Sequence, residues 1–257
     1  MSASEDYAPQ GSVLVGPGCW VPSCNFEPRK NDGKIDLLLL HYTATPTNDY
    51  ALELLTTKAG GVSSHYLIDG EGCILQLVSE EQRAWHAGEA SWAGERDINS
   101  CSIGIEIQNQ GAALARVPEY GRAQMQAVLA LCKDITTRYN IAPSRVLAHS
   151  DVAPLRKQDP GAHFNWELLA QHGVGIVVSP HCEPDGVLAI KTADELLSLQ
   201  SDLAAIGYGA TTSGEMDPLT VAVITAFQRH YRPALVDGVA DRSTVEAISL
   251  LLEAIEA

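Results

Sequence analysis

The chain has 257 residues and carries 17 Lys and Arg against 32 Asp and Glu, which gives a formal net charge of −15. This acidity argues against nucleic-acid binding and against electrostatic attraction to anionic lipid, because both require clustered Lys and Arg. The composition, with 46% hydrophobic and 19% charged residues, is that of a globular protein, and the length predicts one sizeable domain plus a small one.

Residues 1–33 are rich in Gly, Pro, Ser and Asn without a hydrophobic period, which predicts an irregular N-terminal arm. The first residues have neither the basic nor the apolar region of a secretory signal. The sequence therefore predicts a cytoplasmic protein, or a periplasmic one if a leader has been removed. No apolar run approaches the roughly 18 residues of a membrane helix, so membrane insertion is not expected. Six scattered cysteines without a Cys-x-x-Cys pair indicate free thiols.

The next segment, residues 34–178, alternates strand and helix signals. Short apolar runs bounded by Gly or polar residues predict strands, two of them flank a Gly-containing turn as in a hairpin, and one longer segment has helical spacing. The expected strands are 35–42, 64–68, 74–78, 102–108 and 146–148, and the expected helix is 119–139. These elements predict an α/β fold in which helices flank a mixed β-sheet.

The C-terminal part differs from residues 34–178 in composition and hydrophobic pattern. Residues 179–190 contain several Pro, Gly and acidic residues and predict a linker. Beyond it, residues 191–257 show three stretches of helical spacing, the first opened by a capping box from Thr192 to Glu195. The second begins at Asp217 and the third at Asp241, so this part predicts a small three-helix domain.

Candidate metal ligands lie at the ends of two predicted strands. His41 is near the end of strand 35–42, His149 follows strand 146–148, and Asp159 comes ten residues after His149. Two imidazoles and a carboxylate, with one position left for water, are typical of a catalytic zinc site. Spacing alone does not select this set among eight histidines, and a mixture of surface and core histidines is the alternative.

Short motifs add more specific information. The chain contains, in order, LHYTAT (40–45), SSHYLI (63–68), AWHAG (84–88), SIGIE (102–106), AHSD (148–151) and RKQDPG (156–161). Together these strings resemble the zinc-dependent N-acetylmuramoyl-L-alanine amidases of the amidase-2 family over roughly residues 20–178. A second, shorter resemblance is to a three-helix peptidoglycan-binding module, through LQ (199–200), GY (207–208), AFQ (226–228) and DG (237–238).

The resemblance implies a role for each residue of the site. His41, His149 and Asp159 would bind Zn²⁺, which lowers the pKa of water towards about 7. Glu106 falls on the general-base position, where a carboxylate can take up the proton of the attacking water. Lys157 falls on the position that stabilises the developing oxyanion. Taken singly, Glu106 would be interpreted as an outward-facing strand residue and Lys157 as a solvated loop charge.

The resemblance also indicates substrate-binding residues. Trp85 and His86 are expected along the substrate groove, where an indole can lie against a sugar face. His65 is a further candidate, and its alternative is a core histidine that bonds to backbone. Neither His65 nor His86 is expected to bind the metal, since three protein ligands suffice.

The activity implied is hydrolysis of the amide between the lactyl group of N-acetylmuramic acid and L-alanine, in cell-wall recycling or remodelling. The expected partners are peptidoglycan or muropeptide fragments. One alternative is a peptidoglycan recognition protein that binds muropeptide without cutting it. Loss of a metal ligand would distinguish such a protein from the enzyme. Another is a structural cell-wall adaptor, which would need no metal ligands at all.

Overall fold

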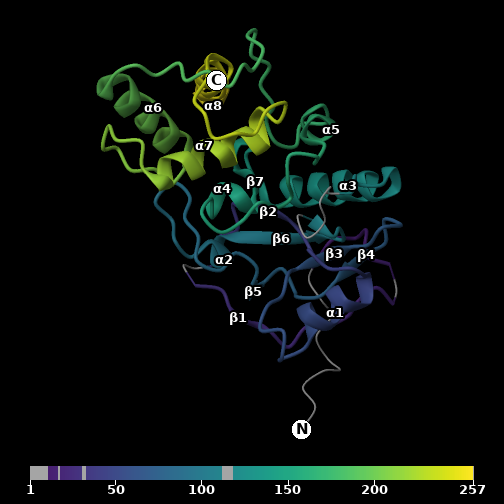
Figure 1. Ribbon diagram of the computed structural model, residues 1–257. Helices are drawn as coiled ribbons and strands as arrows, with labels where there is room; N and C mark the ends of the chain where they lie inside the picture. Colours follow the sequence, from purple (N-terminus) through teal and green to yellow (C-terminus); the bar gives the residue numbers. More distant parts are fainter. Residues whose placement is uncertain (1–10, 17, 31–32, 112–117, 257) are drawn as a thin grey trace.

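A computed structural model describes residues 11–16, 18–30, 33–111 and 118–256. A five-stranded mixed sheet lies at its centre, in the order β4-β3-β6-β2-β7. β2 pairs in parallel with β6 and β7, β3 pairs in parallel with β6, and β4 joins β3 in the antiparallel hairpin that the sequence predicted. The strands are β2 (Leu37–Tyr42), β3 (Tyr66–Ile68), β4 (Ile74–Gln76), β6 (Ser102–Ile107) and β7 (Val146–Ala148) (Figure 1).

Side-chain alternation along the strands divides the sheet into two faces. Leu38 and Leu40 of β2 pack in one cluster with α3 (Arg122–Tyr139), whereas Leu37 and Leu39 belong to a second cluster on the other face. His41 continues this second face. The α/β fold with a mixed sheet flanked by helices is therefore confirmed.

The long helix begins later than the sequence predicted. α3 starts at Arg122 rather than at residue 119, because the backbone at its N-cap, Gly121, is still extended (φ −64°, ψ 151°). It ends as expected before Asn140, which adopts a left-handed conformation (φ 50°). This conformation closes a helix more readily at Asn than at most other residues.

Several short elements were not predicted. Within the described part of the N-terminal arm, β1 (Phe26–Pro28) pairs antiparallel with β5 (Gln82–Ala84), so the arm is not irregular throughout. The others are α1 (Asn48–Thr56), α2 (Ile98–Cys101), the 3₁₀ turn η3 (Pro143–Arg145), α4 (His149–Val152) and α5 (Trp166–Ala170). Except for α1, which has nine residues, these elements are runs of three to five residues, too short for periodicity to identify them.

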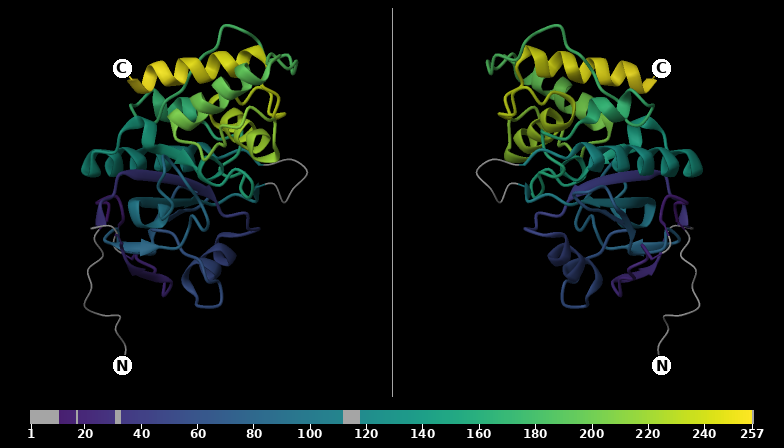
Figure 2. Two further views of the ribbon diagram at one scale, coloured as in Figure 1. Left: turned by 90° about the vertical axis from the view of Figure 1, so that its left-hand side faces the viewer. Right: turned by 90° about the vertical axis from the view of Figure 1, so that its right-hand side faces the viewer.

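The C-terminal helices are α6 (Ala193–Ile206), α7 (Pro218–Tyr231) and α8 (Arg242–Glu256). α6 begins in the expected capping box, with Thr192 and Glu195 bonding reciprocally. The three helices gather at one end of the molecule, and α1, β1 and β5 lie at the other (Figures 1 and 2). Within the described ranges, no helix is both long and apolar enough to cross a membrane. The domain boundaries at 33/34, 178/179 and 190/191 stay predictions.

Candidate active site

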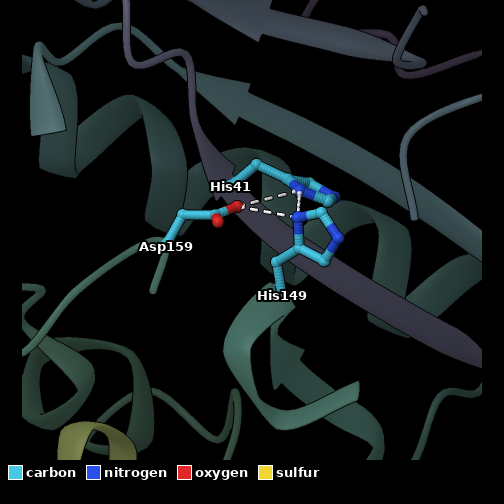
Figure 3. A group of neighbouring side chains, drawn as sticks. All are labelled: His41, His149 and Asp159. Atoms are coloured by element: carbon cyan, nitrogen blue, oxygen red, sulfur yellow. Dashed lines mark hydrogen bonds and ion pairs between the residues drawn. The ribbon is translucent and has the colours of Figure 1, made fainter. Parts of the chain in front are cut away.

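The predicted metal ligands converge on one edge of the sheet. β2 and β7 are adjacent parallel strands, so His41 in β2 and His149 directly after β7 emerge at the same edge. The Nδ1 atoms of these two rings lie 2.8 Å apart. Asp159, in the loop after α4, places Oδ2 at 3.1 Å from His41 Nδ1 and at 2.9 Å from His149 Nδ1 (Figure 3).

The charge state of these three side chains suits a metal ion. Burial, with the neighbouring His149 imidazole, lowers the pKa of His41 to about 4 against the opposing effect of Asp159. Burial alone would raise the pKa of Asp159, but the imidazoles of His149 and His41 outweigh it and hold that pKa well below its usual value. All three side chains are buried. Two imidazoles and one carboxylate that converge in this way can hold a metal ion and fit the three-ligand pattern of catalytic Zn²⁺.

A second layer of contacts fixes the two imidazoles. His41 Nε2 lies 3.1 Å from His86 Nδ1, and His149 Nε2 lies 3.0 Å from the backbone oxygen of Ala87. Asn99, itself buried, accepts hydrogen bonds through Oδ1 from the backbone N–H groups of both His86 and Ala87. The segment 86–87 therefore orients both candidate metal ligands, and Asn99 holds that segment. Such outer partners orient ligands and influence metal affinity.

Glu106 lies directly beside the predicted metal ligands. It pairs in register with His41 across β6 and β2, on the same face of the sheet. Its Oε2 is buried and has no hydrogen-bond partner within the described structure. Burial, followed by the nearby Asp159 carboxylate, raises the pKa of Glu106 well above its usual value, against the lowering effect of the Lys157 ammonium. An unpartnered carboxylate oxygen with a raised pKa is suited to accept a proton.

A cavity of about 200 Å³ opens over these residues. Its lining includes Trp85, His86, Glu106, His149, Lys157 and Asp159. The indole Nε1 of Trp85 is buried without a hydrogen-bond partner in the described ranges. Most of the predicted site thus meets at one cavity.

His65 is placed differently. Its ring is fully buried, Nδ1 accepts a hydrogen bond from the Gly104 N–H, and Nε2 lies near Gln82 O and the Arg29 guanidinium. Both ring nitrogens are therefore engaged, and His65 is not among the residues that line the cavity. This is the geometry of the alternative, a core histidine bonded to backbone, and substrate binding by His65 stays a prediction without support from its position.

Two residues whose side chains bond to the backbone of segment 86–89 were not predicted from the sequence. Asn99 lies in α2, four residues long, and no local pattern connects it to segment 86–87. Arg156, whose guanidinium donates to the backbone oxygens of Ala87 and Glu89, was likewise overlooked. Arg156 directly precedes Lys157 in the RKQDPG string, and this position is the sequence feature that could have pointed to it as a site residue.

A buried His-His-Asp cluster beside a carboxylate and an ammonium, on the edge of a mixed sheet, is the arrangement expected of a metal-dependent hydrolase. Comparison with known proteins makes this specific. Residues 31–162 match the family model of N-acetylmuramoyl-L-alanine amidase, and residues 192–248 match that of a peptidoglycan binding domain. The chain therefore belongs to the N-acetylmuramoyl-L-alanine amidase family, as its motifs indicated.

Individual relatives agree. The chain is 40% identical to N-acetylmuramoyl-L-alanine amidase AmiD of Escherichia coli over 86% of its length and 83% of the relative. It is 31% identical to 1,6-anhydro-N-acetylmuramyl-L-alanine amidase AmpD of Citrobacter freundii, over 57% of this chain and 84% of the relative.

Two solved structures share the fold. The E. coli AmiD complex with anhydro-N-acetylmuramic acid-L-Ala-D-γ-Glu-L-Lys superposes with a TM-score of 0.73 at 36% identity, covering 90% of this chain and 98% of that one. Pseudomonas aeruginosa AmpDh3 in complex with anhydromuramic pentapeptide gives 0.73 at 31% identity, covering 91% and 98%.

Proposed function

We propose that this chain is a zinc-dependent amidase that cleaves the bond between the lactyl group of N-acetylmuramic acid and L-alanine in peptidoglycan or muropeptides. The observation that carries the proposal is the convergence of His41, His149 and Asp159 on one point beside the unpartnered oxygen of Glu106. The family gives the reaction class, and this geometry assigns residues to its parts.

The three ligands would hold Zn²⁺, which when bound lowers the pKa of a water molecule towards about 7 and polarises the substrate carbonyl. Glu106 then accepts the proton of the attacking water and passes it to the amine that leaves as the N-terminus of the stem peptide. Lys157 lines the same cavity and places a positive charge where the carbonyl oxygen becomes negative. Trp85 also lines this cavity, which supports the proposed contact of its indole with the sugar.

The substrate class rests on the relatives. The complexes of AmiD and AmpDh3 both contain anhydromuramic acid linked to a peptide. A similar fragment is therefore the first substrate to test for this chain. The C-terminal helices match a peptidoglycan binding domain family, which favours an additional interaction with the polymer. Fractionation of native cells would decide between a cytoplasmic and a periplasmic location.

A recognition protein that binds muropeptide without cutting it is the alternative. Such a protein needs neither a complete metal site nor a proton acceptor. Here the three candidate ligands lie together, and Oε2 of Glu106 is buried without a hydrogen-bond partner in the described structure. A buried carboxylate oxygen without a partner is costly, and a catalytic role would account for it.

The test is to incubate the purified chain with anhydro-N-acetylmuramic acid tripeptide and to follow the released tripeptide by liquid chromatography and mass spectrometry. His149→Ala should lose bound zinc and activity together, because three ligands leave no redundancy. His172→Ala, at an exposed position in the turn after α5, is the matched control and should keep both. Full activity of a metal-free His149→Ala protein would refute the proposal.

A further inference from the structure

A buried carboxylate connects the C-terminal helices to the turn that carries His149. Asp151 lies in α4, two residues after His149, and is fully buried. Its Oδ1 accepts a hydrogen bond from the Tyr208 hydroxyl at 2.7 Å. Its Oδ2 accepts one from His230 Nδ1 at 2.6 Å and one from the Ala148 N–H at 2.8 Å. Two of the three hydrogen-bond donors therefore come from the C-terminal part of the chain.

The position of His230 is closely determined by its surroundings. It lies near the end of α7, and its ring centroid is 3.7 Å from that of Trp166 and 3.8 Å from that of Tyr231, with the rings nearly parallel. Trp166 belongs to α5, which precedes the predicted linker. An imidazole of the helical part is thus inserted into the part of the chain that carries the site.

The surrounding apolar contacts are continuous across the same boundary. Leu39 of β2 and Leu147 of β7 belong to one buried cluster with Leu203 of α6 and Phe227 of α7. In Figure 1, α7 lies next to α4, on the side of β2 and β7 (Figure 1). The helices therefore cover the second face of the sheet rather than standing apart from it.

The Asp151 carboxylate matters for the metal site because it lies in α4, the helix that also carries His149. α4 begins with His149, and the Ser150 N–H donates to the backbone oxygen of Asp159 at 3.1 Å. A carboxylate removed from water is stable only while hydrogen bonds satisfy it. Without its partners from the C-terminal helices, Asp151 would turn towards water and release the Ala148 N–H. Both metal ligands attached to this turn would then lose their support.

We propose that the C-terminal helices are a structural part of the metal site, in addition to any contact with peptidoglycan. Tyr208 and His230 are positioning residues: they hold Asp151, and Asp151 holds α4 in the geometry that binds the metal. The inference rests on the proposed zinc site. It predicts that a change in the helical part alters zinc affinity without touching a ligand.

The experiment measures zinc dissociation constants of full-length variants by competition with a chelating indicator. Tyr208→Phe removes one hydroxyl and should weaken zinc binding roughly 10-fold, and His230→Leu by roughly 10–100-fold, the range for partners of metal ligands. His230→Asn places an amide nitrogen near the position of Nδ1, so it should restore affinity to within about threefold of wild type.

Gln200→Leu is the matched control. Gln200 is also fully buried in the helical part and donates to Glu215 O and Thr220 Oγ1, but none of its hydrogen bonds involves Asp151. It should lower thermal stability without changing zinc affinity. As a second measurement, hydrogen exchange at the Ala148 amide should accelerate in His230→Leu and not in Gln200→Leu.

The outcomes separate the two proposals. If Tyr208→Phe and His230→Leu bind zinc as tightly as wild type, the positioning role is wrong, and Tyr208→Phe alone decides this should His230→Leu not fold. An equal loss of affinity in Gln200→Leu would also overturn it, because general destabilisation would then explain the effect. If His149→Ala itself keeps zinc, the proposed function fails instead.

Discussion

Glu106→Gln separates proton transfer from metal binding, because it preserves the size of the side chain and removes its ability to accept a proton. Glu106 is not part of the His-His-Asp cluster, so zinc content should stay near one ion per chain. Its Oε2 has no hydrogen-bond partner in the described structure, so the substitution breaks no hydrogen bond of that atom. The variant should therefore fold normally.

The expected rate loss is roughly 10²–10⁴, the usual span for a positioned general base. At about 1.36 kcal/mol per decade, this corresponds to about 2.7–5.4 kcal/mol of activation free energy. The loss should appear mainly in kcat, since proton transfer strengthens only in the transition state. Because burial raises the pKa of Glu106, wild-type kcat/KM should rise with pH through that pKa, and this acid limb should disappear in Glu106→Gln.

The assay combines steady-state release of tripeptide, measured from pH 4 to 9, with zinc content of the same samples. Glu53→Gln, an equal charge change on exposed α1, is the control and should behave as wild type. Loss of zinc in Glu106→Gln would make Glu106 a support of the metal, and near-normal turnover would place the base elsewhere. Asp151 and His65 are poor replacements, since hydrogen bonds within the protein occupy both.

Lys157→Met should keep zinc and lower kcat by roughly 10²–10³, as for removal of one oxyanion stabiliser. It should also move the acid limb of the pH profile to higher pH, because the Lys157 ammonium lowers the pKa of Glu106. An acid limb at the wild-type pH would contradict this. Asn99→Ala frees segment 86–87 and should weaken zinc binding roughly 10–100-fold, measured by indicator competition. For the metal-free protein, the pKa of His41 is about 4 when folded and near 6.5 when unfolded. The unfolded chain therefore binds more protons between these values, and stability should fall by about 3 kcal/mol as pH drops from 6.5 to 4, measured by urea denaturation.

The strands that carry the two candidate histidines could be predicted from the sequence. The apolar run before His41 identified β2, and the short strand before His149 identified β7. The carboxyl ends of neighbouring parallel strands meet at one edge of a sheet, which brought these two ligands together. Glu106 lies in the adjacent strand β6, in register with His41, but its role was predicted only from the resemblance of its motif to the amidase-2 family.

Contacts between segments far apart in the chain could not be predicted, because no local sequence pattern indicates them. Asp151 and His230 are 79 residues apart, and each separately resembles an ordinary polar residue of its helix. β1 and β5 have three residues each, neither forms an apolar run, and most of their positions are exposed or half-buried, so no hydrophobic pattern marks them. The role of Asn99 depends on two backbone N–H groups, which the side-chain pattern of a sequence does not record.

The hydrogen bonds around both histidines determine which ring nitrogen carries the proton, and they leave Nδ1, the nitrogen that faces Asp159, unprotonated in each. The backbone oxygen of Ala87 can only accept a hydrogen bond, so His149 Nε2, 3.0 Å away, must carry the proton. A neutral imidazole carries one proton, which leaves Nδ1 of His149 with a free lone pair. That lone pair lies beside His41 and Asp159, where the metal would bind.

His41 reaches the same state through one further residue. The Ser102 hydroxyl donates its proton to the backbone oxygen of Ile98 at 2.6 Å, so towards His86 Nε2, 3.4 Å away, it can only accept. His86 therefore carries its proton on Nε2 and accepts through Nδ1, and His41 must donate from Nε2. His41 Nδ1 is left free, as in His149. The fold thus prepares both imidazoles in the ligating tautomer, and neither has to release a proton when the metal binds.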